Sequence, residues 1–392
     1  MVVNVHENCY VHNIVNMRGI VNTVGPVDLE LRLAAVLREL LLRANWLAGW
    51  TVERPNGKSG WDLVVSGPLP GDGKAVLCVE CKHHFQPSQF STLVDRHCHG
   101  DPSEINGRVL AMPSVSPRMA VLCEQHGWSW FDLAGNCHLE IPRLLLIERS
   151  GHEPVRIDRP SVANLSSPEA GRVVRALLSP ENAGRRWTQR EMVAHFHVLG
   201  PPVDPPSLAL VNKVVQHLRA QAFLESLPNR GFRVRDYEGL LQEWRQAYRF
   251  RRSSRRRYFT LLQDGAVSEK LRKLETAAHG RIAYGVFSAA EIQAPHVRQS
   301  RIWLYVTGDI EEQVSATLEA KLVDTGENLT MLIPEDAGVF YQLDVGNSRL
   351  ACTNAAQTYI DLVNAGGRGE EAAEAVLRRR LKPAWSATAD GL

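Results

Sequence analysis

Three residues in the first hundred have the types and spacing that metal-dependent hydrolysis needs. Glu80 and Lys82 lie in the run VLCVECKHH, which predicts a β-strand, and a strand points residues i and i+2 to the same face. Asp62 lies one predicted hairpin away and can bring a second carboxylate beside Glu80. Two carboxylates bind a hard cation such as Mg²⁺ or Mn²⁺, and a lysine can activate the attacking water. If the site is active, Asp62 and Glu80 are the expected metal ligands, and all three residues are the expected catalytic groups for phosphodiester cleavage.

The surrounding residues predict the elements that would position this set. Val27 to Ala44 carries apolar residues at helical period, which indicates an amphipathic helix. A second helix is predicted at Ser116 to His126. Asp132, Gly135 and Asn136 are typical of a turn that closes a strand. Short apolar runs between turn-rich stretches predict strands at 62–65, 75–79, 108–112, 128–133 and 144–148.

Asp62, a spacer and then Glu80-X-Lys82 form a pattern that resembles the PD-(D/E)XK nuclease superfamily. The resemblance extends over roughly the first 150 residues. The resemblance implies a restriction-endonuclease-like core and a further acid on the preceding helix, for which Glu30 and Glu39 are candidates. The motif is short, and many members of the superfamily keep the scaffold for binding only. The alternative is that Glu80 and Lys82 form a solvated ion pair without catalysis.

A second cluster in the same region has side chains that bind zinc: Cys78, Cys81, His83, His84, His97, Cys98 and His99. Cys78 and Cys81 are three residues apart in a predicted strand, so their thiols should point to opposite faces. Zinc knuckles place this pair in a turn. We therefore expect a strand cysteine and surface histidines rather than a structural zinc.

The middle of the chain is its basic part. Between residues 161 and 260 there are 17 Lys and Arg and 8 Asp and Glu, a local charge of +9, so the rest carries 2 − 9 = −7. A proline-bearing polar stretch near Pro160 predicts a domain boundary. Helices are predicted at 168–178, 188–197 and 206–222, the second starting with a capping box of Thr188 and Glu191. The turn LPNRGFRV follows, and three helices with a hairpin predict a winged helix-turn-helix over 161–235.

In such a domain, outward side chains on the second helix of the helix-turn-helix contact the bases of duplex DNA, and the wing binds phosphates. Leu210, Val214, Val215 and Leu218 are expected in its core. The expected DNA contacts are Ser207, Asn212, Lys213, Gln216 and Arg219 on the helix, and Arg230, Arg233 and Arg235 in the wing. No cofactor is needed for such binding. The alternative is a winged helix that binds another protein.

An arginine run follows the winged helix. RFRRSSRRR places six arginines between Arg249 and Arg257, and we expect Arg251, Arg252, Arg255 and Arg256 to extend the DNA contact. The alternative is that these arginines pair with the acidic remainder of the chain or with a partner.

Residues 236–392 form a third predicted domain, α/β and regulatory, with strands such as IWLYV and MLIPE and an exposed charged helix in GRGEEAAEAVLRR. The line WSWFDLAGN, the segment RVRDYEGLLQEWRQAYRF and the tail QTYIDLVNAGGRGEEAAEAVL resemble the antitoxins of type IV toxin-antitoxin systems, the abortive-infection AbiEi kind. The resemblance implies a repressor of its own promoter that counteracts a nucleotidyltransferase-like toxin without a stable complex.

Composition fits this organisation. With 392 residues, 44% hydrophobic and 22% charged, the chain predicts a folded α/β multidomain protein: a nuclease-like domain at 1–160, a winged helix at 161–235 and a C-terminal α/β domain. It shows no membrane span or leader, and seven scattered cysteines favour reduced thiols, so we expect a cytoplasmic protein. A DNA-binding transcriptional regulator is the expected function, and binding to a pseudo-palindromic operator would favour a dimer. The alternative is a Mg²⁺-dependent endonuclease in phage defence or DNA processing.

Overall fold

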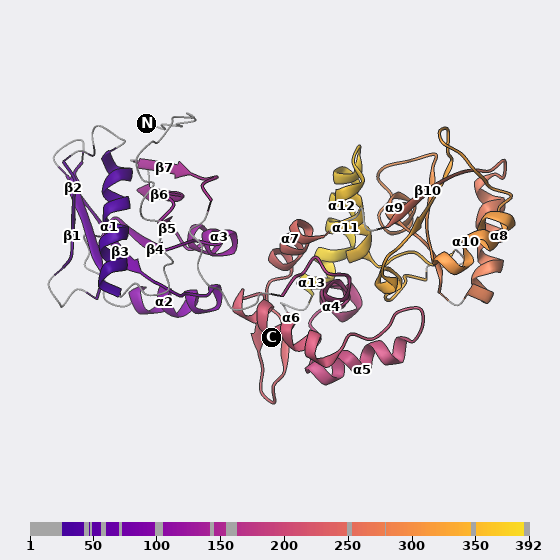
Figure 1. Ribbon diagram of the computed structural model, residues 1–392, viewed down its shortest axis with the longest axis horizontal. Helices are drawn as coiled ribbons and strands as arrows, with labels where there is room; N and C mark the ends of the chain where they lie inside the picture. The colour runs from indigo at the N-terminus through magenta and orange to yellow at the C-terminus, as the bar shows by residue number, and fades with distance from the viewer. Residues whose placement is uncertain are drawn as a thin grey trace. The chain divides into compact units, whose positions relative to one another are not determined.

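The computed structural model describes residues 26–42, 47, 49–55, 60–69, 73–98, 105–141, 145–153, 163–248, 253–278, 280–345 and 350–387. The chain divides into two compact units, Met1–Ser161 and Val162–Leu392 (Figure 1). Each unit combines helices with β-sheet, so the mixed α/β class predicted from the sequence is confirmed. Among the described helices, none is long and apolar enough to cross a membrane.

The first unit contains a seven-stranded sheet whose strands are arranged in chain order. Strands β1 to β3 are antiparallel, β3 to β5 are parallel, and β5 to β7 are antiparallel. Helices supply the crossovers that the parallel pairs require. The elements are α1 (Pro26–Leu42), β1 (Thr51–Glu53), β2 (Leu63–Pro68), β3 (Lys74–Cys81), α2 (Phe90–Cys98), β4 (Gly107–Met112), α3 (Pro117–Gln125), β5 (Trp128–Asp132), β6 (Cys137–Ile141) and β7 (Leu145–Arg149).

Helices cover both faces of this sheet. The apolar stripe of α1 packs on one face, where Val79 and Cys81 point, and α2 and α3 pack on the other, where Cys78 points. Strand alternation therefore places Cys78 and Cys81 on opposite faces, as predicted. Glu80 shares its face with Cys78 and points toward α2.

The predicted turn at Asp132, Gly135 and Asn136 joins β5 to β6. The carboxylate oxygen Oδ1 of Asp132 accepts from the backbone N–H groups of Ala134 and Asn136, each at 3.0 Å. Gly135 has φ +83°, a left-handed backbone conformation that residues with a Cβ rarely adopt. The turn prediction is confirmed, whereas strand β6 was missed because its residues CHLEI follow the turn with a mixed polar pattern.

The second unit starts with three helices and a short hairpin: α4 (Pro168–Leu178), α5 (Gln189–Leu199), α6 (Leu208–Ala220), β8 (Leu224–Ser226) and β9 (Phe232–Val234). The three helices lie where the sequence predicted them. The remaining elements are α7 (Tyr237–Ala247), β10 (Ser254–Phe259), α8 (Asp264–Ala278), β11 (Ile282–Tyr284), α9 (Val286–Gln293), β12 (Ile302–Val306), α10 (Glu311–Thr317), β13 (Lys321–Leu322), β14 (Leu329–Ile333), α11 (Ala355–Ala365), α12 (Gly369–Val376) and α13 (Lys382–Ser386), with a π-helical turn at Leu377–Leu381.

A five-stranded sheet in the order β11-β12-β14-β10-β13 organises this second part, with β12 and β14 parallel. Helices α8 and α10 cover one face of it. The other face contributes Trp303, Tyr305 and Leu332 to a large core that also includes α4 to α7, α9, α11 and α12. One hydrophobic core thus joins the three helices and hairpin to the C-terminal sheet.

Helix α12 corrects one expectation. The segment GRGEEAAEAVLRR was predicted to be an exposed charged helix, but Ala372, Ala373 and Val376 are buried in the shared core. The charged residues occupy only its outer face. The small alanines allow α12 to pack closely against α11.

Candidate DNA-binding surface and carboxylate cluster

Side-chain caps fix the starts of the three helices. Ser167, Thr188 and Ser207 each accept a hydrogen bond from the backbone N–H three residues on. Thr188 also donates its own backbone N–H to Glu191, which completes the predicted capping box. Polar caps of this kind contribute about 1 kcal/mol each, so they set where α4, α5 and α6 begin.

Helix α6 has one buried and one exposed face. Val211, Val214, Val215 and Leu218 are buried, whereas Leu210, expected in the core, is half-buried. The exposed side chains are those predicted to touch DNA: Ser207, Asn212, Lys213 and Gln216. Ser207 is the N-cap, and the amide oxygen of Asn212 accepts from Gln189 Nε2 at 2.9 Å. Lys213 and Gln216 are fully directed to solvent.

The hairpin carries the predicted wing arginines. Leu227 N–H donates to the Gly231 carbonyl at 2.9 Å across the turn, and Asn229 and Arg230 at its tip have φ of +59° and +61°. Arg230 and Arg235 are exposed. No described carboxylate forms an ion pair with Lys213, Arg230 or Arg235, so their charges remain available to a polyanion.

Two arginines predicted to reach DNA are instead held by the protein. Arg219 was expected to point outward, but its Nη2 donates to the Gly231 carbonyl at 3.0 Å and its guanidinium lies over the Phe232 ring at 5.6 Å. Arg233 pairs with Glu225 across the hairpin. Both side chains stabilise the junction of α6 with the hairpin, a long-range contact that helical or strand periodicity does not reveal.

Basic residues that the sequence reading did not single out lie near α5. Arg185, Arg186 and Arg190 are exposed, and the Arg185 guanidinium stacks on Trp187 at 3.8 Å from the ring centroid. The available signal was the RRW triplet directly before the capping box. Trp187 forms a β-bridge with Phe232 of β9, so Arg185 and Arg186 belong to the segment that pairs with the hairpin.

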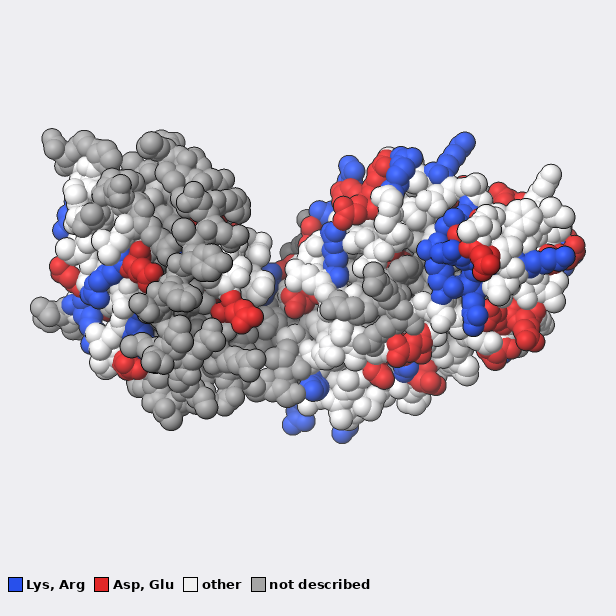
Figure 2. Space-filling view, turned by 45° about the horizontal axis from the view of Figure 1, so that its top comes forward, with Lys and Arg blue, Asp and Glu red and all other residues white. Residues whose placement is uncertain are grey.

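The arginine run is partly neutralised within the chain. Arg255 Nη2 lies 3.8 Å from Glu327 Oε1 and Arg256 Nε lies 3.7 Å from Glu311 Oε1, both from strand β10. Arg301 approaches the same oxygen of Glu327 to 2.9 Å. Figure 2 shows Lys and Arg side chains interspersed with Asp and Glu in this unit. Pairing with acidic residues, the alternative for this run, therefore applies to Arg255 and Arg256, while Arg251 and Arg252 lie outside the described residues.

In the first unit, the predicted carboxylates and lysine come together. Asp62 Oδ2 accepts from the Cys81 backbone N–H at 2.7 Å, next to Glu80 on the same strand. Lys82 pairs with Glu80 Oε1. Helix α2 adds two bases that the sequence did not place there: Arg96 Nη1 at 3.8 Å from Glu80 Oε1, and His97 Nε2 at 3.3 Å from Oε2.

The two members of the Glu80 and Lys82 pair differ in burial. Glu80 is only 3% exposed, and Trp61 stacks on His97 with 3.7 Å between ring centroids, which covers the site. Burial raises the pKa of Asp62 above its ordinary value, and the Glu80 charge raises it further against the Cys81 N–H and Lys82. Glu80 is therefore the buried member of the pair, whereas the Lys82 side chain is 30% exposed.

Glu30, one candidate for the further acid, pairs with Arg54. Its charge is near the cluster nevertheless, because burial and then the charges of Asp62, Glu30 and Glu80 raise the pKa of the Cys81 thiol. The three carboxylates thus surround one strand end. Glu39, the other candidate, is exposed on α1.

This cluster does not fit a metal ion as it is arranged. Both oxygens of Glu80 face a basic side chain, and Asp62 Oδ2 is taken by a backbone donor. Within the described residues no set of three His, Cys, Asp or Glu side chains has the geometry to hold a metal. That finding covers Cys78, Cys81, His83, His84 and His97, whereas the Cys98 side chain and His99 lie outside the described part.

A buried polar network centres on Asp361 of α11. Its Oδ1 accepts from Tyr248 Oη at 2.9 Å and Gln357 Nε2 at 2.8 Å, and its Oδ2 accepts from Tyr305 Oη at 3.0 Å. Gln357 Oε1 accepts from Arg175 Nε on α4 at 2.7 Å. The sequence motif QTYIDL was visible, but its inward role was not predicted. The network ties the first helix of the unit to its C-terminal sheet.

Comparison with protein families gives a match over part of the chain. Residues 233–382 match the family described as "Transcriptional regulator, AbiEi antitoxin, Type IV TA system". The matched segment runs from β9 through α12 and contains the tail motif that carried the resemblance, so that resemblance is confirmed for this part of the chain. Searches of curated proteins and of solved structures returned no match.

Proposed function

We propose that this protein is an antitoxin-like transcriptional regulator that binds duplex DNA through α6 and the β8–β9 hairpin, a winged helix-turn-helix. The observation that carries DNA binding is the exposed set of Lys213, Gln216, Arg230 and Arg235, whose cations have no described acidic partner. Such side chains suit base edges and phosphates. The order of three helices and a hairpin, and the +9 charge of residues 161–260, also support it.

The regulatory role rests on the family match over residues 233–382, which is joined to the three helices by one core. By analogy with that family, the functional partner is the toxin of a type IV system, for which we propose a nucleotidyltransferase-like enzyme. A homodimer would match a pseudo-palindromic operator, since protein two-fold symmetry mirrors such sites.

DNA binding is tested by fluorescence anisotropy with the duplex upstream of the protein's own gene, over a salt series. Lys213→Ala and Arg230→Ala are each expected to weaken binding several-fold and to lower the salt slope by about one, because each removes one phosphate contact. Lys273→Ala on α8, an exposed lysine outside the proposed surface, is the matched control. Equal losses in all three variants, or no wild-type binding at low salt, would overturn the proposal.

A metal-dependent nuclease is the second candidate. The convergence of Asp62, Glu80 and Lys82 favours it, as does a sheet in which an antiparallel meander leads into parallel strands. Glu80 Oε1 is paired with Lys82 and Asp62 Oδ2 with the Cys81 N–H, an arrangement that disfavours Mg²⁺ or Mn²⁺, so we derive no cleavage step.

We expect supercoiled plasmid to stay intact with the wild type in Mg²⁺ or Mn²⁺, because Glu80 Oε1 is paired with Lys82 and Oε2 faces His97 at 3.3 Å, which disfavours a cation there. Gel electrophoresis after incubation measures this. Metal-dependent cutting that disappears in Asp62→Ala and Lys82→Ala would contradict the expectation and make the first unit a nuclease. If the Lys273→Ala preparation also fails to cut, the loss is not specific to the cluster. The cutting would then come from a contaminating enzyme whose amount differs between preparations.

A further inference from the structure

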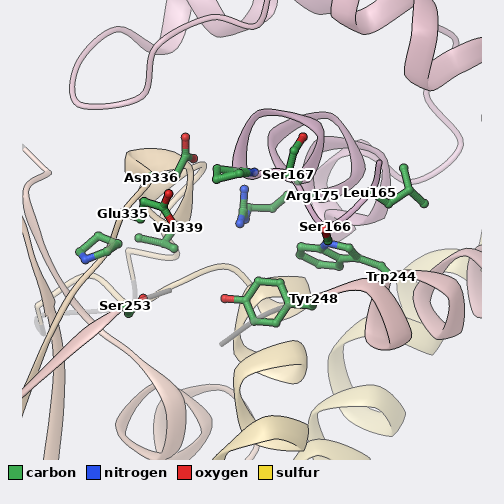
Figure 3. Close-up of a pocket in the computed structure, with 13 residues that line it drawn as sticks. Leu165, Ser166, Ser167, Arg175, Trp244, Tyr248, Ser253, Glu335, Asp336 and Val339 are labelled. Atoms are coloured by element: carbon green, nitrogen blue, oxygen red, sulfur yellow. The ribbon is translucent and has the colours of Figure 1, made fainter. Parts of the chain in front are cut away.

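A pocket opens in the second unit beside the start of α4. Its walls come from α4, from Trp244 and Tyr248 at the end of α7, and from residues 334–339 after β14 (Figure 3). The empty volume is about 460 Å³, its open mouth included. This volume includes solvent space at the mouth, so the enclosed part of the pocket is smaller and suits a small chemical group.

Gly171 on α4 shows that the pocket is a hollow in the packing. The residue is buried, yet a Cβ built on it would meet no atom within 4 Å. Protein interiors are normally close-packed, so a buried helical position with open space in front of it borders a real cavity.

Two buried donors in this pocket have no hydrogen-bond acceptor among the described residues. Arg175 is 3% exposed, and although its Nε donates to Gln357, its Nη1 is unpaired. Trp244 is fully buried and its Nε1 is also unpaired. Figure 3 shows the Arg175 guanidinium lying among Ser167, Val339, Tyr248 and Trp244. Unpaired buried N–H groups cost about 1–3 kcal/mol each, which a bound acceptor would recover.

The electrostatics of the pocket favour an anion. The N-terminus of α4, with Ser167 and Pro168 in the lining, adds the positive end of a helix dipole to the Arg175 charge. Asp336 lies in the same wall, but the Arg172 guanidinium binds both its oxygens, with Nε at 3.1 and 2.9 Å. Glu335 at the rim disfavours a ligand with several negative charges. A singly charged group is the best match.

The aromatic lining specifies the rest of the ligand. Trp244 and Tyr248 present rings next to the guanidinium, and Arg175 itself lies 5.5 Å from the Trp244 ring centroid. The two unpaired donors, Arg175 Nη1 and Trp244 Nε1, can each donate to a carboxylate oxygen, and aromatic walls bury a small apolar body. We propose that the pocket binds a small organic carboxylate as an effector and that, given the proposed DNA-binding function, its occupancy changes the affinity for operator DNA.

The link to DNA binding follows from the pocket wall. The segment after residue 336 continues to Tyr341, whose hydroxyl accepts from Asn182 Nδ2 at 2.8 Å and lies 2.8 Å from His195 Nε2 on α5. A ligand that contacts residues 334–339 therefore acts on the segment that braces α5. By linkage, DNA and effector must change each other's affinity by the same factor.

The site is tested by isothermal titration calorimetry of the full chain with sodium benzoate, acetate and inorganic phosphate at constant ionic strength. Benzoate is expected to bind, acetate to bind more weakly, and phosphate not to compete. Gly171→Leu should lower benzoate affinity at least about ten-fold, because the added side chain fills the hollow. Trp244→Phe, which keeps a ring but removes the donor, should lower it several-fold.

Gly265→Leu is the matched control, since this glycine is also helical with no atom within 4 Å of a built Cβ, but is exposed on α8. No benzoate binding to the wild type, or equal binding to Gly171→Leu, would remove the site. If benzoate binds but leaves wild-type DNA affinity unchanged, the coupling is wrong and the site stands. Absence of DNA binding in every condition would instead remove the proposed function.

Discussion

Replacing Asp361 with alanine is expected to lower the free energy of unfolding by about 3–5 kcal/mol at pH 5. The substitution leaves the hydroxyl groups of Tyr248 and Tyr305 and the amide of Gln357 without their acceptor. Asp361, Tyr305 and Gln357 are fully buried, so water cannot replace the lost partner cheaply. Urea denaturation followed by tryptophan fluorescence measures the difference.

The same residue predicts a pH dependence. Burial raises the pKa of Asp361 from 3.8 to about 6, against the hydrogen bonds from Gln357 and the tyrosines that lower it. Because the folded-state pKa is the higher one, the protonated carboxyl stabilises the fold below pH 4. Each pKa unit corresponds to about 1.36 kcal/mol, so a shift from 3.8 to about 6 contributes about 3 kcal/mol. This contribution is lost as the pH rises through 6. The difference between wild type and Asp361→Ala should therefore shrink between pH 5 and pH 8.

Asp361→Asn is the control, because an amide keeps an acceptor and cannot ionise. This variant should be close to the wild type at pH 5 and should lack the loss of stability between pH 4 and pH 7. If the asparagine variant follows the wild-type pH profile, Asp361 is not the titrating group. If the alanine variant is as stable as the wild type at pH 5, the network does not support the core.

Gly369→Ala is expected to lower the free energy of unfolding by about 3 kcal/mol, the upper end for overpacking. A Cβ at this position would lie 2.1 Å from the backbone carbonyl oxygen of Leu362. A backbone atom cannot rotate away as a side chain does, so α11 and α12 would have to separate. The motif GGRG is thus explained by packing: Gly366 and Gly367 have φ of +77° and +56° and turn the chain, and Gly369 lets the next helix lie against the last.

Gly171→Ala serves as the comparison for this second substitution. It adds the same methyl group to a helical glycine with free space, so it should stabilise the protein by about 0.5–1 kcal/mol through helix propensity. Urea midpoints for both variants, with unchanged denaturant slopes, would establish the contrast. Two variants with similar small effects would show that α11 and α12 can move apart without penalty.

Local sequence patterns predicted many of the elements, though not helix α2, and did not predict the contacts between elements. The apolar stripe of α1, the capping box at Thr188 and the turn at Asp132 depend on neighbouring residues, and each of these predictions is confirmed. Alternation also placed Glu80 and Lys82 on one strand face. The strand β6 was missed because its mixed pattern gives no clear period.

The environment of each candidate residue depends on distant parts of the chain. His97 and Arg96 approach Glu80 from α2. Glu225 pairs with Arg233 across the hairpin, and Glu327 pairs with Arg255. No spacing rule reveals such pairs, since the partners approach only after the helices and sheets have packed. For this reason the basic side chains that stay available could not be separated from those that the fold uses.

The shared core from Ala163 to Trp385 determines where recombination can divide the gene without disrupting the fold. A recombination breakpoint between the two compact units leaves each with its own interior, so the first unit can be exchanged as a block. A breakpoint after the hairpin would instead cut Arg175 from Gln357 and expose the apolar surfaces of α4 and α11. We expect the three helices, the hairpin and the C-terminal sheet to be passed on as one heritable module.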